Sequence, residues 1–299
     1  MKISFSDMDS FLIWLYSTID DMNTQTELPL YIERFSNNHI PNFSDNELFT
    51  CAIFSEMLGF HTKKSGYDYI KRHYLSWFPL LPSYEVYSRK LNKFNEALGY
   101  IFNVICKRYF PTNCKQAVID TAPIVVCTQR HSAKAQAGKS LIDKGYCASK
   151  KMYYVGVKLQ LLAGLQEKTL PFPFDYEIQP ASTHDLEIAK QTLPDYQNLD
   201  IYSDKAYIDQ GFQMDLFENN HINLITPIKK KKGGPDLTLF QKCYNYLHSQ
   251  KRQAIENLFG WIIKKTDIEN ANKVRNIEGL CYHINVKMVA ALLFLIIKF

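Results

Sequence analysis

The 299-residue chain lacks the usual marks of a secreted, zinc-binding or membrane-spanning protein. Its seven cysteines include no C-x-x-C pair, so they indicate neither a zinc site nor a disulfide framework, and reduced thiols are the simplest interpretation. The start, Met1 to Asp7, has an early acid and no small-residue cleavage site, so no signal peptide is predicted. The apolar run Met288 to Ile297 is too short to span a bilayer and is expected to be a buried final helix. We therefore expect a cytoplasmic protein with no membrane partner.

Positive charge is scarce in the first third of the chain. Residues 1–110 contain 11 Lys and Arg and 12 Asp and Glu, a net charge of −1. Residues 111–299 contain 24 Lys and Arg and 18 Asp and Glu, a net charge of +6. Because contacts to a nucleic-acid backbone come mainly from Lys and Arg, the second part is the better candidate for strand binding. An ordinary solvated surface has a similar balance, so charge alone does not decide between the two.

The first third is predicted to be helical. Ser44-x-x-Glu47 is a capping-box candidate for a helix that ends before Gly59. Further helices are predicted at residues 66–78 and 83–110, the latter from one apolar stripe that runs through its whole length. Lys63, Lys64, Lys71 and Arg72 are the main basic cluster of this region.

The remainder of the chain alternates between strand and helix patterns. Strands are predicted at 115–126, 153–165, 174–179, 199–203 and 222–228, and helices at 183–193, 210–219, 240–265 and 276–298. Such an alternation indicates a mixed sheet flanked by helices, an α+β or α/β fold. The hydrophobic content of 46% is sufficient for a packed core.

Three carboxylates stand in three different kinds of segment. Asp120 closes the apolar run 117–119, Asp204 closes the run 199–203, and Glu256 lies in a helical pattern with one buried stripe. Hard divalent cations prefer oxygen ligands, so two strand-end aspartates and a helical glutamate suit a two-metal site for phosphoryl transfer. The chain has 30 Asp and Glu, however, and strand-end acids are usually turn or cap residues.

Two neighbours of Glu256 strengthen this interpretation. Arg252 is one helical turn before Glu256 and Gly260 is one turn after it, so the three share a face. An arginine there can hold a phosphate or orient the carboxylate, and a glycine leaves room for a metal or a DNA backbone. An ordinary intrahelical ion pair with a tolerated glycine explains the same pattern.

The local sequences around the three acids carry a family resemblance. Residues 118–123 read V-I-D-T-A-P, residues 203–207 read S-D-K-A-Y, and Arg252, Glu256 and Phe259 are spaced R-x3-E-x2-F. These resemble the D-S/T-x-P strand, the D-K-G-Y turn and the Y-x2-R-x3-E-x6-K helix of the DDE transposases of bacterial insertion sequences. The order fits too, with 83 residues between the two aspartates and 51 between the second aspartate and the glutamate.

The resemblance covers roughly residues 80–299. It includes Lys150 and Lys151 before a predicted strand, Gly156-x-Lys158 within it, and I-x-P-A-x3-D at 178–185 after it. Together these motifs are a specific signal, because each lies at the expected place relative to the acids.

The chain departs from the family pattern at three positions. Ala206 replaces the usual glycine of the turn, a small change unless the residue has a positive φ angle. Ser249 stands where the tyrosine is expected, and Ile263 where the lysine is expected, with Lys264 and Lys265 just beyond. At about 100° per residue, Lys264 lies about 80° round the helix from Glu256 and Lys265 about 180°, so Lys264 is the candidate to replace the missing lysine.

The resemblance implies an RNase H-like mixed sheet flanked by helices, preceded by an all-helical N-terminal region. Residues 1–110 would then bind the DNA ends of the element, and residues 111–299 would form the catalytic domain. In this fold neighbouring strands bring the two aspartates together, and a helix lays the glutamate across them.

The resemblance also implies the chemistry and the partners. Asp120, Asp204 and Glu256 would hold two Mg²⁺ ions, which Mn²⁺ can replace, and would catalyse cleavage at the element ends and strand transfer into target DNA. A homodimer or a larger homo-oligomer on DNA is expected. The candidate DNA-binding residues are Lys150, Lys151, Lys158, Lys205, Arg252 and Lys264.

Two basic segments and two histidines complete the sequence predictions. Residues 127–151 are predicted to form a loop over the DNA channel, and the lysines at 229–232 to form a charged tip, although most such runs are merely solvated. His131 and His184 are isolated, so neither is predicted to bind a metal.

Two alternatives to a transposase remain. The chain can be a metal-dependent nuclease of the same fold that hydrolyses DNA without joining it, or an inactive remnant that only binds DNA. The helical first third and the three motifs favour a transposase over the nuclease, and the intact triad of acids argues against the remnant.

Overall fold

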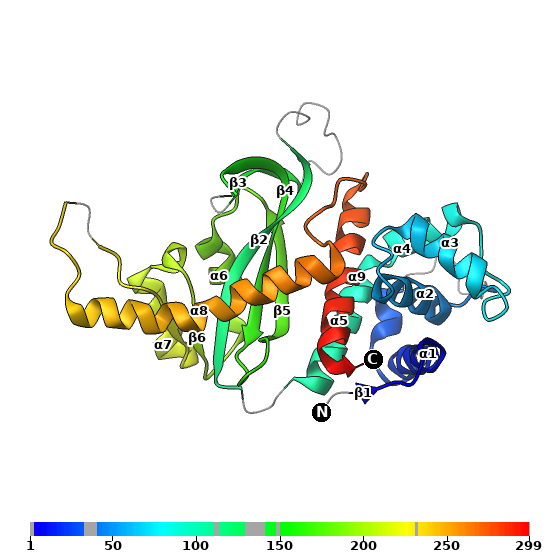
Figure 1. The fold of residues 1–299 in the computed structure, drawn as a ribbon, viewed down its shortest axis with the longest axis horizontal. Coiled ribbons are helices and arrows are strands. Elements are labelled where there is room, and N and C mark those ends of the chain that lie inside the picture. The colour runs from blue at the N-terminus through cyan, green and yellow to red at the C-terminus, as the bar shows by residue number, and fades with distance from the viewer. Residues whose placement is uncertain are drawn as a thin grey trace. The chain divides into compact units, whose positions relative to one another are not determined.

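A computed structural model describes residues 3–32, 41–110, 114–128, 141–147, 150–230 and 233–298 (Figure 1). The chain folds as two compact units. The helical unit contains Met1–Tyr109 and Ile262–Phe299, and the sheet unit contains Phe110–Trp261. In sequence, the sheet unit is therefore an insertion within the helical unit.

The helical unit is built around its last helix. Its helices are α1 (Met8–Gln25), α2 (Asp45–Met57), α3 (Lys63–His73), α4 (Tyr84–Lys93), α5 (Asn95–Tyr109) and α9 (Ile277–Ile296). Helix α9 packs against α2, α4 and α5, and most of its side chains are buried. Two short strands at the chain ends, β1 (Ile3–Ser4) and β8 (Ile297–Lys298), pair in parallel, and a 3-10 turn η1 (Leu28–Tyr31) follows α1.

The capping box predicted at the start of α2 is confirmed. The Ser44 hydroxyl accepts a hydrogen bond from the Glu47 amide at 3.2 Å, and the Glu47 carboxylate accepts one from the Ser44 amide at 2.7 Å. This reciprocal pair satisfies amide groups that the first helical turn leaves free.

The prediction of one helix over residues 83–110 is wrong in one respect, because the structure has two helices there. Helix α4 ends at a cap on Phe94, whose amide donates to the Lys90 carbonyl, and α5 begins at Asn95. The Asn95 side chain donates to the Asn92 carbonyl, and its own carbonyl accepts from Asn285 of α9. The apolar stripe continues through the break, so hydrophobic periodicity could not show it.

The predicted boundary at residue 110 also differs from the observed units. The first unit ends near this residue, at Tyr109, but residues 262–299 belong with the helical unit and not with the sheet. The reason is that α9 is apolar on nearly all sides and fills the core formed by α2, α4 and α5. By length and composition α9 could cross a membrane, but 78% of its most apolar stretch is buried inside the protein, as the sequence predicted for a buried final helix.

The sheet unit contains a six-stranded mixed sheet. Its strands are β2 (Gln116–Thr128), β3 (Asp143–Cys147), β4 (Met152–Gly164), β5 (Phe172–Pro180), β6 (Asp200–Tyr202) and β7 (Asn223–Ile225). The order is β3-β4-β2-β6-β7, and β5 continues the edge that β3 forms along β4. Strand β4 is antiparallel to β2, β3 and β5, whereas β6 and β7 are parallel to β2 and to each other.

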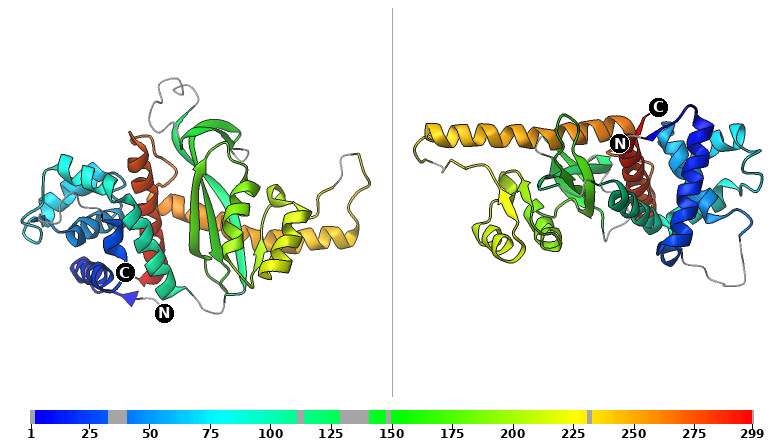
Figure 2. Two further views of the ribbon diagram at one scale, coloured as in Figure 1. Left: turned by 180° about the vertical axis from the view of Figure 1, so that it is seen from behind. Right: turned by 90° about the horizontal axis from the view of Figure 1, so that it is seen from below.

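Helices cover both faces of this sheet. Helix α8 (Leu239–Thr266) crosses one face, and α6 (Asp185–Thr192) and α7 (Gln210–Asn220) lie on the other (Figures 1 and 2). Short 3-10 turns, η3 (Leu193–Asp195) and η4 (Lys205–Tyr207), lie beside these elements. This arrangement is the predicted RNase H-like fold, with four antiparallel strands, β2 to β5, followed by the two parallel strands β6 and β7, and with helices on both faces.

Successive side chains of a strand point to opposite faces of the sheet, and this determines which residues of β2 and β4 contact which helices. Ala117 and Ile119 of β2 and Leu162 of β4 are buried in the core that includes residues of α6 and α7. The alternate residues of β2, including Asp120, point to the face that α8 covers, because successive side chains of a strand point to opposite faces.

The predicted loop at 127–151 is wrong in part. Strand β2 continues to Thr128, and Asp143–Cys147 forms the edge strand β3 against β4. An edge strand needs few apolar residues, so β3 has no clear hydrophobic pattern. Residues 129–140, which include Arg130, His131, Lys134 and Lys139, and residues 148–149 lie outside the described part of the chain.

The charged tip at 229–232 is only partly described. Lys230 forms an exposed ion pair with Asp236 at 2.6 Å. Lys231 and Lys232 lie outside the described residues.

Candidate active site

The two aspartates of the predicted triad lie at the same level of the sheet. Strands β2 and β6 pair with Gln116 opposite Asp200, Ala117 opposite Ile201 and Val118 opposite Tyr202. Strand β6 ends at Tyr202, and Asp204 follows two residues later, where this register, if continued, is level with Asp120. Asp204 is close enough to raise the pKa of the Asp120 carboxyl. Because neighbouring strands are about 4.8 Å apart, this register brings two carboxylates close together on one face.

Arg252 of α8 joins Asp120 to Glu256. Its Nη2 atom donates to Asp120 Oδ2 at 3.0 Å and to Glu256 Oε1 at 3.1 Å. The Asp120 side chain is 20% exposed and that of Glu256 is 49% exposed, so the aspartate lies under α8 and the glutamate lies at its open side. One guanidinium thus links two acids from a strand and a helix that are far apart in the sequence.

Asp204 is held in place by the turn that follows it. Its Oδ1 atom accepts a hydrogen bond from the Ala206 amide, so the carboxylate caps η4. Ala206 is not among the residues with positive φ, and therefore the alanine adopts this turn without the strain that would require glycine. The departure from the family turn at this position does not disturb the backbone.

Electrostatics single out Asp120. Burial raises the pKa of the Asp120 carboxyl, and the nearby Asp204 raises it further, while Arg252 and the Thr121 amide oppose the rise. Placing two carboxylates together in a half-buried site is unfavourable unless a cation compensates them. Arg252 supplies one positive charge to this group of acids.

Arg252 also has an unused donor. Its Nε atom is buried and has no hydrogen-bond partner within the described part of the chain. A buried N–H without an acceptor is costly, and arginine commonly binds carboxylate or phosphate oxygens through two donors at once. The site therefore has a donor that suits an anionic oxygen from outside the protein.

The donor set fits a hard divalent cation. All three acids offer carboxylate oxygens, the ligands that Mg²⁺ prefers. Within the residues described, no group of three Asp, Glu, His or Cys side chains is placed to hold one ion, and the Glu256 carboxylate accepts a hydrogen bond from Arg252. The prediction that Asp120, Asp204 and Glu256 bind metal ions stays a prediction.

Sequence reasoning missed His248, which lies beside the site. It is one turn before Arg252 on α8, its side chain is buried, and its Nε2 donates to the Ile225 carbonyl at 3.1 Å. The ring lies 6.0 Å from that of Tyr202 on β6, and burial lowers the pKa of the imidazole. The spacing 248, 252, 256 along one helical face was the signal that could have shown it.

Lys158 lies on the other face of the sheet. It stands opposite Pro123 in the β2–β4 pair, so it points away from α8, and its Nζ donates to the Thr183 carbonyl at 2.7 Å and to Asp185 at 2.9 Å. Thr121 donates to the same Asp185 oxygen at 3.1 Å. The structure therefore places Lys158 in a clamp that ties β4 to the start of α6, and does not bring it together with the three acids.

The other predicted DNA-binding lysines are exposed. Lys205 directly follows Asp204, and Lys150 and Lys151 form the turn between β3 and β4, where Lys151 has a φ of 50°. Lys264 is exposed near the end of α8, whereas the Lys265 ammonium lies 5.3 Å from the centre of the Phe294 ring. Their role in DNA binding stays a prediction.

Comparison with known proteins identifies the family. The model of the family described as "Transposase DDE domain" matches residues 115–279, more than half of the chain. The matched range contains Asp120, Asp204, Arg252 and Glu256. No curated protein and no solved structure matches the chain. The family acts on DNA and generally uses divalent metals, as the sequence resemblance implied. From the match and from the RNase H-like sheet that carries the acids, we conclude that the chain belongs to the transposase DDE domain family.

Proposed function

We propose that this protein is an insertion-sequence transposase whose acids Asp120, Asp204 and Glu256 form one site for DNA end cleavage and strand transfer. The observation that carries the proposal is the arrangement of the acids. Asp120 lies on β2, Asp204 lies just beyond the end of the adjacent parallel strand β6, and Arg252 links Asp120 to a glutamate on α8.

The three carboxylates would hold Mg²⁺ ions, and Mn²⁺ can take their place. Bound metal would supply Lewis-acid stabilisation of the charge that develops on phosphate and hydroxyl oxygens during in-line attack on phosphorus. The protein supplies the positions of the ligands. The Ala206 amide fixes Asp204 at the strand end, and the Thr121 amide donates to Asp120 at 2.8 Å.

Arg252 and Gly260 would admit the DNA strand to this site. The free Nε of Arg252 can donate to a phosphate oxygen while Nη2 stays on the acids. Gly260 is exposed one turn after Glu256, and, apart from its chain neighbours and the adjacent backbone of α8, no described atom lies within 4 Å of the place where a side chain would begin. This part of α8 therefore leaves space for a DNA backbone next to the glutamate.

The exposed lysines would bind DNA beyond the site. We propose phosphate contacts for Lys150, Lys151, Lys205 and Lys264, with element ends and target DNA as the partners. Lys158 would act indirectly by holding β4 against Asp185. The protein would assemble on DNA as a homodimer or a larger homo-oligomer and would work in the bacterial cytoplasm.

Isosteric substitution of each acid tests the site. Asp120→Asn, Asp204→Asn and Glu256→Gln should each lower Mg²⁺-dependent cleavage of element-end DNA by at least about 100-fold, because each removes a metal ligand. A gel-shift assay should show largely retained DNA binding. Asp200→Asn is the matched control, because Asp200 begins β6, at the end away from Asp204, and its cleavage should stay near that of the wild type.

The outcomes separate the alternatives. Near-normal cleavage by Glu256→Gln would remove the glutamate from the ligand set. Cleavage by all three variants would place the chemistry elsewhere. A wild-type protein that cuts the ends but never joins them to target DNA would be a nuclease of this fold and not a transposase.

A further inference from the structure

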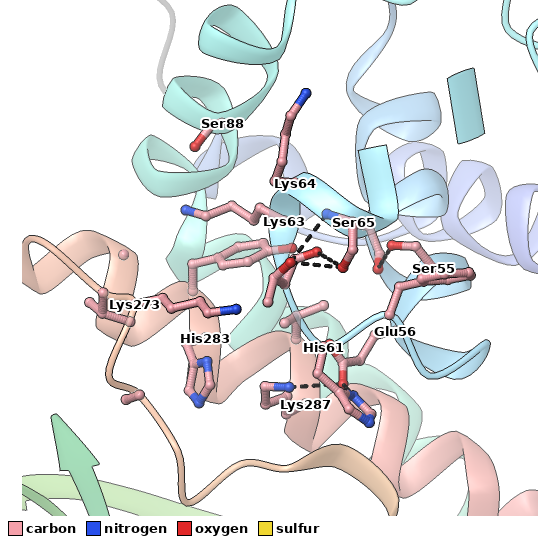
Figure 3. A pocket seen from close by; sticks show the side chains of 18 of the residues that line it. Ser55, Glu56, His61, Lys63, Lys64, Ser65, Ser88, Lys273, His283 and Lys287 are labelled. Carbon is pink, nitrogen blue, oxygen red and sulfur yellow. Dashed lines mark hydrogen bonds and ion pairs between the residues drawn. The ribbon is translucent and has the colours of Figure 1, made fainter. Parts of the chain in front are cut away.

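The helical unit contains a polar cavity that the proposed catalytic site does not use. Its volume is about 580 Å³, within the range of ligand-binding pockets. Its walls come from α2, α3, α4 and α9 and from the segment 267–276 that leads into α9 (Figure 3). All of its lining residues belong to the helical unit.

Positive charge exceeds negative charge in this cavity. The charged lining residues are Lys63, Lys64, Lys273, Arg275 and Lys287 against Glu56, Asp68 and Asp267. Two of the cations already have acidic partners: Lys64 pairs with Asp68 at 2.8 Å, and Lys287 pairs with Glu56 at 2.9 Å. Among the described residues, Lys63, Lys273 and Arg275 form no ion pair.

Lys63 is the most unusual of the three unpaired cations. It is half-buried, its ammonium donates to the neutral side chain of Asn92, and it lies 4.5 Å from the centre of the Tyr282 ring. Burial lowers the pKa of the Lys63 ammonium to about 8. An ammonium that is desolvated without a carboxylate gains stability when an anion reaches it.

Lys63 and Lys273 reach the cavity from different elements. Figure 3 shows them entering it from opposite sides, Lys63 from α3 and Lys273 from the segment before α9, whereas Lys64 points away from Lys273. Lys273 and Arg275 are exposed and line the same cavity as the half-buried Lys63, so all three cations border the space that a ligand would fill.

Two helix starts add to the positive potential. The first turn of α3, from its cap Thr62 to Ser65, lines the cavity, as do the cap of α9, Asn276, and Gly279 of its first turn. The start of a helix carries partial positive charge and presents amide groups that anions can bind. The helix starts and the unpaired cations therefore favour the same kind of ligand.

We propose that this cavity is a phosphate-binding site in which Lys63, Lys273 and Arg275 contact the phosphate oxygens, and that the phosphate is a phosphodiester of bound DNA. The assignment to DNA rests on the proposed function, because a protein that acts on DNA meets phosphodiesters in every complex. The chemistry of the pocket also suits a free nucleotide, which carries the same group. The cavity is thus a second point of DNA contact, on α3 and α9, separate from the acids of the sheet unit.

Protection of Lys63 from an amine-reactive reagent tests the proposal directly. The full-length protein is acetylated near pH 8, and the rate at each lysine is followed by mass spectrometry, alone and with a short DNA duplex, ATP or pyrophosphate. DNA should slow acetylation of Lys63 and Lys273, because a bound phosphate holds the amines protonated and covers them. Lys190 is the internal control, because it pairs with Asp209 at 3.1 Å, does not line the cavity and should react as before.

Binding measurements provide the second test. Lys63→Gln and Lys273→Gln should each weaken DNA binding by about tenfold, the loss of one charged hydrogen bond. Each should also reduce the slope of log K against log salt by about one unit. Lys190→Gln, at an ion-paired lysine outside the cavity, is the matched control and should stay close to the wild type. Because Lys273 is exposed, its variant keeps the test valid if Lys63→Gln does not fold, which thermal unfolding will show.

These measurements use binding without metal, so they do not depend on cleavage. Protection by DNA together with weaker binding by the two variants supports the proposal, even if the acid variants overturn the catalytic assignment. Protection by ATP or pyrophosphate but not by DNA keeps the phosphate chemistry and overturns DNA as its source. Unchanged Lys63 reactivity with every ligand, or wild-type DNA affinity in folded Lys63 and Lys273 variants, overturns the site.

Discussion

Arg252 marks the limit of what sequence spacing shows about single residues. The interval of four residues predicted that Arg252 and Glu256 are neighbours on one helix, and the structure confirms this. The bond from Arg252 to Asp120 joins residues 132 positions apart, and it depends on how α8 lies on the sheet. Spacing within a helix contains no information on that packing.

Lys158 shows that a family motif on a strand also does not predict which face of the sheet a side chain occupies. The family motif placed it near Asp120 in space, and it does lie on the neighbouring strand. Whether two such residues share a face depends on the register of the pair, and a shift by one residue would reverse the answer. The register could not be read from the sequence, so the sequence could not show that Lys158 points away from the three acids.

The half-buried His283 gives a prediction on pH and stability. Its Nε2 donates to the Ile268 carbonyl at 2.9 Å, and burial, with Lys287 and Lys63 nearby, lowers its pKa from 6.5 to about 3. The folded state therefore binds fewer protons than the unfolded state between these values. Stability contributed by neutral His283 is complete above about pH 6.5 and falls by up to about 1.4 kcal/mol per unit as pH decreases toward 3.

Urea unfolding of His283→Gln and of the wild type between about pH 7 and pH 5 measures this effect. The wild type should lose more unfolding free energy over the range than the variant does. His184→Gln, a change at an exposed histidine, should leave the wild-type dependence intact. Parallel curves for His283→Gln and the wild type would show that His283 does not titrate between the two states.

At the scale of elements, segments with a strong apolar periodicity were predicted correctly, and segments with a weak or continuous pattern were not. The long strands β2 and β4 and the helices α7 to α9 lie where the apolar patterns predicted them, to within a few residues. Strand β3 was missed because an edge strand buries few side chains. The break between α4 and α5 was missed because both helices bury one continuous stripe, so no change of pattern marks the cap at Phe94.

Gly156 gives the prediction at this scale. It lies in β4, and a Cβ atom there would collide with the carbonyl oxygen of Ile124 in β2. Backbone cannot move aside as a flexible side chain can, so Gly156→Ala should destabilise the protein by about 1–3 kcal/mol, the usual cost of overpacking. Because β2 carries Asp120, cleavage should fall as well.

Gly211→Ala in α7 is the matched control for this prediction. A Cβ at Gly211 meets its nearest atom at an ordinary 3.5 Å, so the change should be neutral or stabilise the helix by up to about 1 kcal/mol. Chemical denaturation of both variants measures the difference. Equal stability of the two would mean that β2 and β4 have room to separate at Gly156.

The molecule as a whole is one unit inserted into another, and this could not be predicted from local patterns. The sequence indicated a helical part followed by a catalytic part, but α9 completes the helical unit from the far end of the chain. The contacts responsible are long-range: Asn285 donates to the Asn95 carbonyl, and Lys287 pairs with Glu56, which is 231 positions away. A pattern that identifies α9 as a buried helix does not say which core it fills.

The insertion predicts how fragments of the chain behave. Residues 1–110 alone lack α9, so they expose the apolar surfaces of α2, α4 and α5 that it covers, and they leave the buried Glu56 without Lys287. Removing one partner of a buried ion pair costs about 3–5 kcal/mol, before the lost apolar contacts are included. The fragment should therefore be unfolded or aggregated, with poor amide dispersion in NMR spectra and no cooperative thermal transition.

A chain that joins residues 1–109 to residues 262–299 through a Gly/Ser linker should fold, because it contains every helix of the unit. The Lys287→Met variant of this joined chain tests the buried ion pair. Methionine can fill the buried position, but it leaves Glu56 with His61, at 2.7 Å, as its remaining ion-pair partner among the described residues. It should melt at a lower temperature than its parent. A well-folded 1–110 fragment would show that α9 is dispensable for the helical core and that the unit ends at Tyr109.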